Sequence, residues 1–249
     1  MHRAELVELY VSKNLSIGEI GKILSLSEKT IFDRLKRLNV PVDPARKPGY
    51  RNKNRGVVIP TEQTAMLAEF LGIMLGDGHL SHFQTVVTLG TKELAYVEYV
   101  AELMQMLFKI QPTILVRKDG YRDIYVSSVV LTAWLRQQGL VPNKVAAQVG
   151  APQWIFEKRE WMEAFVRGFF DTDGSIYRLR FGMQISLTNK SIPLLVSLQG
   201  ILRRLGYRAS AVSLYRVYLT RKTDIERFFA EVRPANRKHL RRFEDIVRT

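Results

Sequence analysis

The chain has 249 residues, and its 38 Lys and Arg against 24 Asp and Glu give a formal net charge of +14, which favours a nucleic acid as the partner. This length allows one large domain or two smaller ones, and the absence of Cys excludes a disulfide framework, a zinc finger and thiol chemistry. Without a long apolar run or an apolar signal segment, the sequence indicates an intracellular protein of the cytoplasm, the nucleoid or an organelle.

Residues 1–40 are predicted to form three short helices. Ser16 and Glu19 have the spacing of a capping box at the start of the second helix, and Ser27 is an N-cap for the third. Three short helices with a tight turn before the last one are typical of a helix-turn-helix, whose third helix enters the major groove. The residues expected to reach DNA are Lys29, Thr30, Arg34 and Arg37. A plain three-helix packing module is the alternative.

Residues 41–60 are rich in Pro, Gly and basic residues and are predicted to be a linker between two domains. Arg51 and Lys53 belong to a basic run that contains a single acid, Asp43. Such a run either is a solvated linker or lies along phosphates and enters the minor groove between two DNA-bound domains.

The rest of the chain is predicted to contain two copies of one unit, residues 61–153 and 154–249. Residues 67–80, LAEFLGIMLGDGHL, and residues 161–176, WMEAFVRGFFDTDGSI, each give an apolar helix, an Asp-Gly pair and a strand. Downstream landmarks also repeat, because Lys144 follows Asp77 at nearly the interval at which Lys238 follows Asp173. Each copy is predicted to have the element order αββαββα, with helices at 62–75 and 160–171 and a strand at 207–213 among the others.

Small residues recur at one face of each of these two helices. Gly72 and Gly76 lie four apart on the first helix, and Gly168 and Thr172 hold the same places on the second. Small residues at this spacing let two helices approach closely, which would bring the acids at their ends together. Two carboxylates in contact repel one another unless cations neutralise them, and Asp oxygens suit hard ions such as Mg²⁺.

The two copies resemble the LAGLIDADG homing endonucleases in their single-chain, two-repeat form. The resemblance rests on the nine positions from Phe70 to Gly78 and from Val166 to Gly174, and it covers roughly residues 60–249. It implies an α+β fold with two pseudo-symmetric repeats that form a saddle of antiparallel sheets, here with a small all-α domain added. The first acid of the family motif is Asp171 in the second copy but Leu75 in the first, so the two half-sites are expected to be unequal.

The resemblance also implies the site residues. Asp77 and Asp173 match the family's metal-binding acid, with the carbonyls of Gly76 and Thr172 as neighbouring ligands. Lys144 and Lys238 match, in placement, basic residues near the scissile phosphates. Thr91 and Asn189 fall where the family often carries a polar residue that orients solvent. The expected cofactor is Mg²⁺, for which Mn²⁺ or Ca²⁺ substitutes in binding.

Alternation along the strands assigns a polar sheet face to DNA, because every second side chain points away from the helices. Arg and Gln on such a face suit guanine and adenine edges in the major groove. The residues assigned to this face are His79, Gln84, Arg117, Tyr121, Asp123, Tyr125, Tyr177, Arg178, Arg180, Gln184, Ser186, Arg208, Arg216 and Tyr218. A merely solvated sheet face is the alternative.

These patterns lead to one main hypothesis, a monomeric endonuclease that hydrolyses a specific site in duplex DNA with a divalent metal ion. A second hypothesis is a DNA-binding regulator that keeps the scaffold without cutting. A third is a maturase that binds intron RNA and assists splicing. The pair of acids at a phosphate-binding surface favours the nuclease, because a pure binding protein gains nothing from unneutralised carboxylates there.

Overall fold

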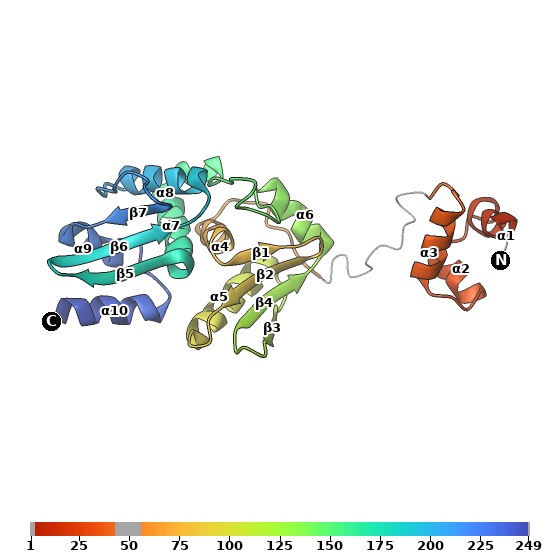
Figure 1. The fold of residues 1–249 in the computed structure, drawn as a ribbon, viewed down its shortest axis with the longest axis horizontal. Coiled ribbons are helices and arrows are strands. Elements are labelled where there is room, and N and C mark those ends of the chain that lie inside the picture. Colours follow the sequence, from red (N-terminus) through yellow and green to blue (C-terminus); the bar gives the residue numbers. More distant parts are fainter. Residues whose placement is uncertain (1–2, 43–55, 249) are drawn as a thin grey trace. The chain divides into compact units, whose positions relative to one another are not determined.

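The computed structural model describes residues 3–42 and 56–248, and Arg51 and Lys53 lie outside these ranges. The chain divides into two compact units, residues 1–53 and residues 54–249 (Figure 1). None of the described helices is both long and apolar enough to cross a membrane.

The described part of the N-terminal unit, residues 3–42, contains four short helical segments. They are α1 (Arg3–Val7), the π-helix η1 (Glu8–Ser12), α2 (Ile17–Ile23) and α3 (Glu28–Arg37). The predicted capping box begins α2, because the Ser16 hydroxyl accepts from the Glu19 amide at 3.2 Å and the Glu19 carboxylate accepts from the Ser16 amide at 2.8 Å. Ser27 caps α3 in the same way, with the Thr30 amide at 3.1 Å. The helices enclose a small core of Leu6, Tyr10, Ile17, Ile20, Ile31, Leu35 and Val40.

The first half of the C-terminal unit has the order α4 (Ala65–Leu75), β1 (Gly78–Leu80), β2 (Gln84–Leu89), α5 (Leu94–Phe108), β3 (Thr113–Val116), β4 (Arg122–Ser127) and α6 (Val129–Gln137). Its four strands form an antiparallel sheet in the order β1-β2-β4-β3. Helix α4 begins later than predicted, because the Thr64 hydroxyl accepts from the Leu67 amide at 3.1 Å and so acts as the N-cap.

The second half has the order η3 (Gln153–Phe156), α7 (Arg159–Asp173), β5 (Gly174–Leu179), β6 (Gly182–Thr188), α8 (Ile192–Arg204), β7 (Arg216–Leu219), α9 (Lys222–Glu231) and α10 (Arg237–Arg248). Its antiparallel sheet has the order β5-β6-β7. The strand predicted at 207–213 is absent there. The segment still pairs in part with β7. The Ser210 amide donates to the Tyr218 carbonyl at 2.9 Å, the Ser210 hydroxyl accepts from the Tyr218 amide at 2.9 Å, and Ser213 forms an isolated bridge with Arg216.

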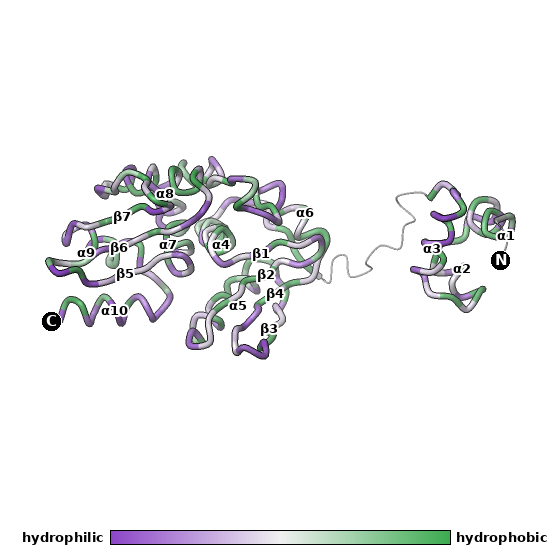
Figure 2. Tube along the Cα trace, viewed as in Figure 1, coloured by the Kyte–Doolittle hydropathy of each residue, from purple (hydrophilic) through white to green (hydrophobic). Residues whose placement is uncertain are grey.

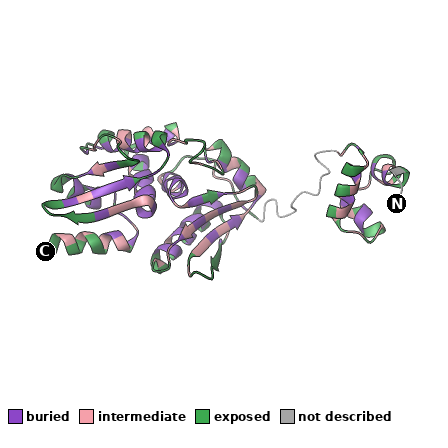
Figure 3. Cartoon of the chain, viewed as in Figure 1, coloured by how far each residue is buried: buried purple, intermediate pink, exposed green. Residues whose placement is uncertain are grey.

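Helices α4 and α7 lie side by side between the two sheets, and the other helices of this unit pack around the sheets (Figure 1). Every residue of α4 from Leu67 to Leu75 is buried, as Figure 3 shows in purple. A helix that is buried on all sides needs neighbours on all sides, and α4 has α7, α5 and β1 in contact with it. The predicted α+β class with antiparallel sheets is confirmed.

Helix α10 differs from α4 because it alternates hydrophilic and hydrophobic positions along its length (Figure 2). Leu240, Phe243 and Ile246 pack against the core, and the Phe243 ring stacks on Phe229 with centroids 4.0 Å apart. The helix thereby covers one side of β5.

Candidate active site between the two repeats

The backbones of α4 and α7 are in direct contact through glycine. A Cβ on Gly72 would overlap the carbonyl oxygen of Phe165, and a Cβ on Gly168 would overlap that of Glu69. One turn further on, Gly76 lies against the Thr172 side chain. The small-residue spacing therefore brings the C-terminal ends of the two helices together, as the sequence predicted.

Two carboxylates lie at these helix ends, Asp77 directly after α4 and Asp173 as the last residue of α7, and both are half-buried. Burial and the neighbouring Asp173 raise the pKa of Asp77 to about 6. Burial also raises the pKa of Asp173, although the Asn189 amide, which donates to its Oδ2 at 2.9 Å, opposes that shift. Negative charge on either acid is therefore costly in this half-buried site, and a nearby cation would stabilise it.

Lys144 supplies one positive charge at this place. Its Nζ donates to the carbonyl oxygens of Met74 at 3.1 Å, Gly78 at 2.9 Å and Gly76. These carbonyls lie at the end of α4, where helix carbonyls lack partners along the chain. Burial lowers the pKa of Lys144, while Asp173 and Asp77 act to raise it. The Lys144 ammonium group thus donates to the Gly76 carbonyl, which the family resemblance assigned as a metal ligand.

Lys238 supplies the second positive charge but has a different partner. Its Nζ lies 2.6 Å from Oε1 of Glu93, which also accepts from Nδ2 of Asn236 at 2.7 Å. Burial acts to raise the pKa of Glu93, but the hydrogen bonds from Lys238 and Asn236 and the charge of Lys238 hold it below its usual value. Coulombic effects of Lys238, Lys144 and Glu93 reach Asp77. We call Asp77, Asp173, Lys144 and Lys238 the carboxylate centre.

The residue of this segment that contacts the site is Glu93, two positions after the predicted Thr91. Thr91 is exposed, its methyl group faces Gly120 and its carbonyl accepts from Arg122 at 3.2 Å. The hairpin turn after β3, rather than the carboxylate centre, is therefore the neighbour of Thr91. The repeated landmarks Thr-Lys-Glu and Asn-Lys-Ser could have indicated Glu93, since only the first of them contains an acid.

Asp171, the first acid of the second motif, points away from the carboxylate centre into the core. It is fully buried, and its Oδ2 accepts from the Ala235 amide at 2.8 Å while its carbonyl accepts from Asn236 at 3.0 Å. Burial raises the pKa of Asp171 to about 8, in spite of the Ala235 hydrogen bond. Asp171 therefore ties α7 to the segment before α10.

The donors at the carboxylate centre fit a hard divalent cation. Two carboxylates with raised pKa values and main-chain carbonyls at two helix ends are the oxygen ligands that Mg²⁺ or Mn²⁺ prefers. The Thr172 hydroxyl donates to the α7 carbonyls of Gly168 and Phe169, which leaves its own carbonyl as the candidate ligand. Within residues 3–42 and 56–248, no three Asp, Glu or His side chains converge to hold a metal ion, so a main-chain carbonyl would have to complete the coordination. The Thr172 carbonyl is the candidate, because the Gly76 carbonyl already accepts from Lys144.

The sheet of the second repeat places most of its predicted residues on the face opposite the helices. Tyr177 pairs with Gln184 and Ser186 with Tyr218, and the Tyr177 hydroxyl donates to Gln184 at 2.7 Å. Arg216 and Tyr218 follow the same alternation around buried Val217. Ser186 shares this face but is itself buried.

Three arginines do not fit the predicted assignment. Arg178 lies next to Tyr177 and must point to the other face, where it donates to the carbonyl of Ile246 at the end of α10 at 2.8 Å. Arg180 is beyond the end of β5, with its guanidinium 5.1 Å from the centroid of the Phe181 ring. Arg208 follows α8 in a segment that is not a strand, so strand alternation gives it no face.

The first repeat places its predicted residues on one face of the sheet. His79 is exposed beside Val86, and Gln84 donates to the Ser127 hydroxyl at 3.1 Å. Arg117 forms an ion pair with Asp123 at 2.7 Å, and Tyr121 and Tyr125 lie on the same hairpin. Asp123 also accepts from the Thr88 hydroxyl at 2.7 Å, so this part of the face is held by its own hydrogen bonds.

In the N-terminal unit, Lys29 and Arg37 are exposed on α3, and Arg34 and Thr30 are half-buried. The Thr30 and Ser27 hydroxyls share a hydrogen bond of 2.8 Å. Helix α3 therefore presents basic side chains to solvent, on a unit whose helix-turn-helix nature stays a prediction.

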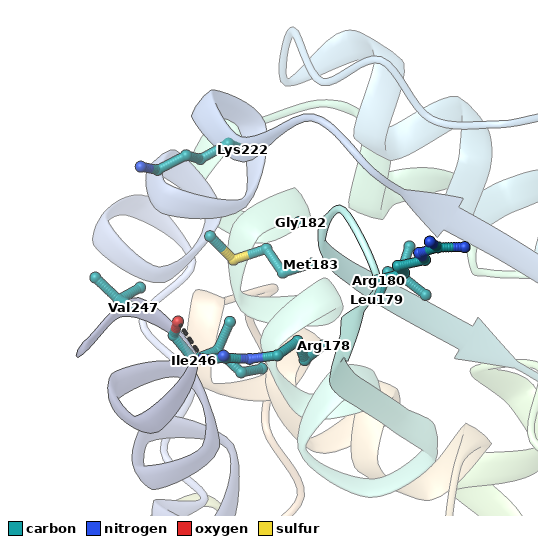
Figure 4. A pocket seen from close by; sticks show the side chains of 8 residues that line it. All are labelled: Arg178, Leu179, Arg180, Gly182, Met183, Lys222, Ile246 and Val247. Carbon is teal, nitrogen blue, oxygen red and sulfur yellow. Dashed lines mark hydrogen bonds between the residues drawn. The ribbon is translucent and has the colours of Figure 1, made fainter. Parts of the chain in front are cut away.

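Two hollows lie on the C-terminal unit. One, of about 320 Å³, is lined by the tip of the β5–β6 hairpin and the end of α10, and Figure 4 shows Arg178 reaching the Ile246 carbonyl there. The other, of about 490 Å³, is lined by the starts of α5 and α10, including Lys92, Glu93, Lys238, Arg241 and Arg242. The second adjoins the carboxylate centre through Lys238 and Glu93, whereas the first contains none of its four residues.

Comparison with known proteins identifies the fold of the C-terminal unit. Residues 160–247 match the family model of the LAGLIDADG-like domain. The C-terminal unit has the LAGLIDADG fold. I-DmoI in complex with DNA and Mn has a TM-score of 0.50 at 19% identity, and the match covers 68% of this chain and 96% of I-DmoI. The N-terminal LAGLIDADG domain of DUF199/WhiA has a TM-score of 0.50 at 18% identity, with 68% and 80% covered.

Curated relatives are similar to this LAGLIDADG-fold protein over short parts of their own length. The replication factor C small subunit of Methanocaldococcus jannaschii is 26% identical over 190 residues, which are 73% of this chain and 10% of that protein. The glutamine–fructose-6-phosphate aminotransferase of the same organism is 24% identical over 213 residues, 84% of this chain and 18% of that protein. The shared segment thus occurs in proteins of two different names and is a small part of each.

Proposed function

We propose that this protein is a monomeric, site-specific endonuclease of duplex DNA that uses Mg²⁺, with Mn²⁺ or Ca²⁺ able to bind in its place. The observation that carries this proposal is the meeting of Asp77 and Asp173 at the ends of two glycine-packed helices, with one lysine from each repeat beside them. A site completed by both repeats of one chain needs no second copy.

In this proposal the charged residues of the carboxylate centre surround the phosphates that are cleaved, one on each DNA strand. Asp77 and Asp173 bind the metal ions, and Asn189 orients the Asp173 carboxylate through its 2.9 Å hydrogen bond. Lys144 and Lys238 offset the charge that develops on the phosphate oxygens during hydrolysis. When bound here, a divalent cation would stabilise the attacking and the leaving oxygen of the phosphodiester. The polar faces of the two sheets read the bases on either side.

The DNA partner is supported by the net charge of +14 and by the I-DmoI structures, which contain target DNA with Mn or Mg. Helix α3 would extend the contact, since Lys29 and Arg37 are available for phosphates. Replacement of both residues by Ala should weaken binding on all sequences alike and reduce its salt dependence, without moving the cleavage position.

The test is cleavage of a randomised duplex library in the presence of Mg²⁺, followed by sequencing of the cut ends. The proposal requires that the cut ends share a recurring site. It also requires the double variant Asp77→Asn with Asp173→Asn to lose cleavage but still to bind the DNA site in the presence of Ca²⁺. Cutting by the double variant, or a lack of any cut duplex, would contradict it. Preference for a structured intron RNA over every duplex would indicate a maturase.

One observation favours a second function, a DNA-binding regulator. The Lys144 ammonium group already donates to the carbonyls of Met74, Gly76 and Gly78. The protein therefore offsets part of the negative charge of the two aspartates with its own cation. Specific binding to a recurring duplex without cleavage, at every divalent ion tried, would support this function over the nuclease.

A further inference from the structure

The turn between Ser213 and Arg216 has a residue pair that its backbone disfavours. Leu214 and Tyr215 both have positive φ, at 47° and 62°, and the flanking Ser213 and Arg216 exchange main-chain hydrogen bonds of 3.0 and 2.9 Å. Two central residues with positive φ are the mark of a type I′ turn, where Asn-Gly is strongly preferred and a bulky side chain is strained.

Packing does not account for the pair. Leu214 is 86% exposed and Tyr215 53% exposed, so neither apolar side chain gains much by burial in the protein. Strained, non-glycine backbone positions are kept where they serve a function. Because these apolar side chains are exposed on a strained turn, we look for their function in contact with another molecule.

The turn is attached to the carboxylate centre. The Tyr215 carbonyl accepts from the main-chain amide of Asn189 at 3.1 Å, and Nδ2 of the Asn189 side chain donates to Oδ2 of Asp173 at 2.9 Å. After the turn, Arg216 and Tyr218 continue along the polar sheet face. Leu214 and Tyr215 therefore lie where the face assigned to DNA meets the residues assigned to cleavage.

The matching turn of the first repeat is built differently. There Gly120 carries the positive φ, at 85°, next to Asp119, whose carboxylate accepts from the Tyr121 amide at 3.1 Å. Gly120 lies against Thr91, just as Tyr215 lies against Asn189. One half thus has an unstrained polar turn at the place where the other half has Leu and Tyr.

We infer that Leu214 and Tyr215 form a wedge that presses against the bases of duplex DNA beside the cleavage centre and opens a base step on that side only. Leu is among the apolar residues that proteins insert between base steps, and a Tyr ring stacks on any base. The energy of this contact offsets the distortion of the duplex, which brings its phosphates to the carboxylate centre. This inference rests on the proposed binding of DNA.

The test uses Leu214→Asn with Tyr215→Gly, which installs the pair that the turn prefers and so keeps the fold. The probe is the duplex recovered from the library by the wild-type protein, with 2-aminopurine placed singly across its central base pairs and Ca²⁺ in place of Mg²⁺. Wild-type protein should raise the 2-aminopurine fluorescence on one side of the centre. The double variant should lose that rise, bind roughly tenfold more weakly and keep or raise its Tm.

Val196→Ala is the control, because Val196 is an equally apolar side chain, 52% exposed on α8, and its loss should change neither reading. Unchanged fluorescence and affinity in the double variant would overturn the wedge while leaving DNA binding intact. An effect confined to self-association of the protein would overturn it too. Failure of the wild-type protein to recover any duplex would instead refute the proposed function.

Discussion

Lys238 Nζ lies 2.6 Å from Oε1 of Glu93 and so joins the second repeat to the first. Its counterpart Lys144 has no acid in this role and donates to three main-chain carbonyls instead. The two lysines match in sequence placement but differ in chemistry, because Glu93 has Ser191 as its equivalent in the second repeat. The carboxylate centre is therefore asymmetric at the lysines as well as at Leu75 and Asp171.

Glu93→Gln should impair the half of the site that contains Lys238 more than the half that contains Lys144. Gln can still accept from Asn236 but carries no charge to hold Lys238, so the lysine should lose its orientation. We expect cleavage of one DNA strand to slow about tenfold relative to the other, with unfolding free energy lowered by about 1 kcal/mol. Strand-specific end labels measure the two rates. Glu98→Gln, an exposed acid on the same helix, is the control, and equal slowing of both strands would contradict the assignment.

Gly72→Ala and Gly168→Ala should each destabilise the protein by about 1–3 kcal/mol, or more, because the added methyl group meets a carbonyl oxygen of the facing helix. The helices would separate and carry Asp77 away from Asp173, so metal binding should weaken as well. Urea denaturation and calorimetric titration with Mn²⁺ measure the two effects. The control is Gly200→Ala in α8, where the nearest atom to a new Cβ is 3.7 Å away and Ala should be neutral or slightly stabilising.

Stability should fall as pH rises when divalent ions are absent. The pKa of Asp77 in the folded protein is about 6, against an ordinary value of 3.8, so the folded state binds the proton more tightly than the unfolded state does. This contribution to stability is present below pH 3.8 and is lost as pH rises through 6. Asp171, with a pKa of about 8, extends the loss to pH 8. Glu93 acts in the opposite sense, since its lowered pKa gives stability that is lost only as pH falls below its usual range.

Asp77→Asn should therefore raise the unfolding free energy at pH 8 in EDTA, by on the order of 1–3 kcal/mol, and should reduce its slope between pH 4 and 7. Urea denaturation across this range measures both. Added Mg²⁺ should stabilise the wild-type protein and not the variant. Asp119→Asn, on an exposed turn, is the control, and a variant less stable than wild type at pH 8 would show that the carboxylates are already neutralised.

Arg167→Leu should destabilise the protein strongly. Arg167 of α7 donates to buried Glu69 of α4 at 2.5 Å, and the Tyr99 hydroxyl donates to the other carboxylate oxygen at 2.5 Å. Loss of the arginine leaves a buried charge with one partner, at a cost of about 3–5 kcal/mol. Glu69→Leu added to Arg167→Leu should recover much of this loss, which a double-mutant cycle in urea measures. A single variant within 1 kcal/mol of wild type would contradict this account.

The pattern of Gly72, Gly168 and the two Asp-Gly pairs was sufficient to predict the helix pair and the two carboxylates. Period-two alternation likewise places Gln184, Arg216 and Tyr218 on one face, because side chains along a strand alternate whatever surrounds them. The same rule, applied strictly, would have excluded Arg178 from that face. The expected strand at 207–213 is reduced to an isolated bridge at Ser213, and the Ser210 hydroxyl accepts one of the main-chain amides of β7.

Local spacing alone determined the two apolar helices and the acids near their ends, because those properties depend on residues a few positions apart. The exact end of the second helix was not determined in this way, since α7 extends to Asp173 instead of the predicted residue 171. The tertiary structure decided the surroundings of each acid and lysine. Asn236 reaches Glu93 across 143 residues of chain, and no periodicity within either repeat records that contact. Two copies of one motif also share their sequence pattern without sharing their neighbours, so the difference between Lys144 and Lys238 arises only when the two halves pack together.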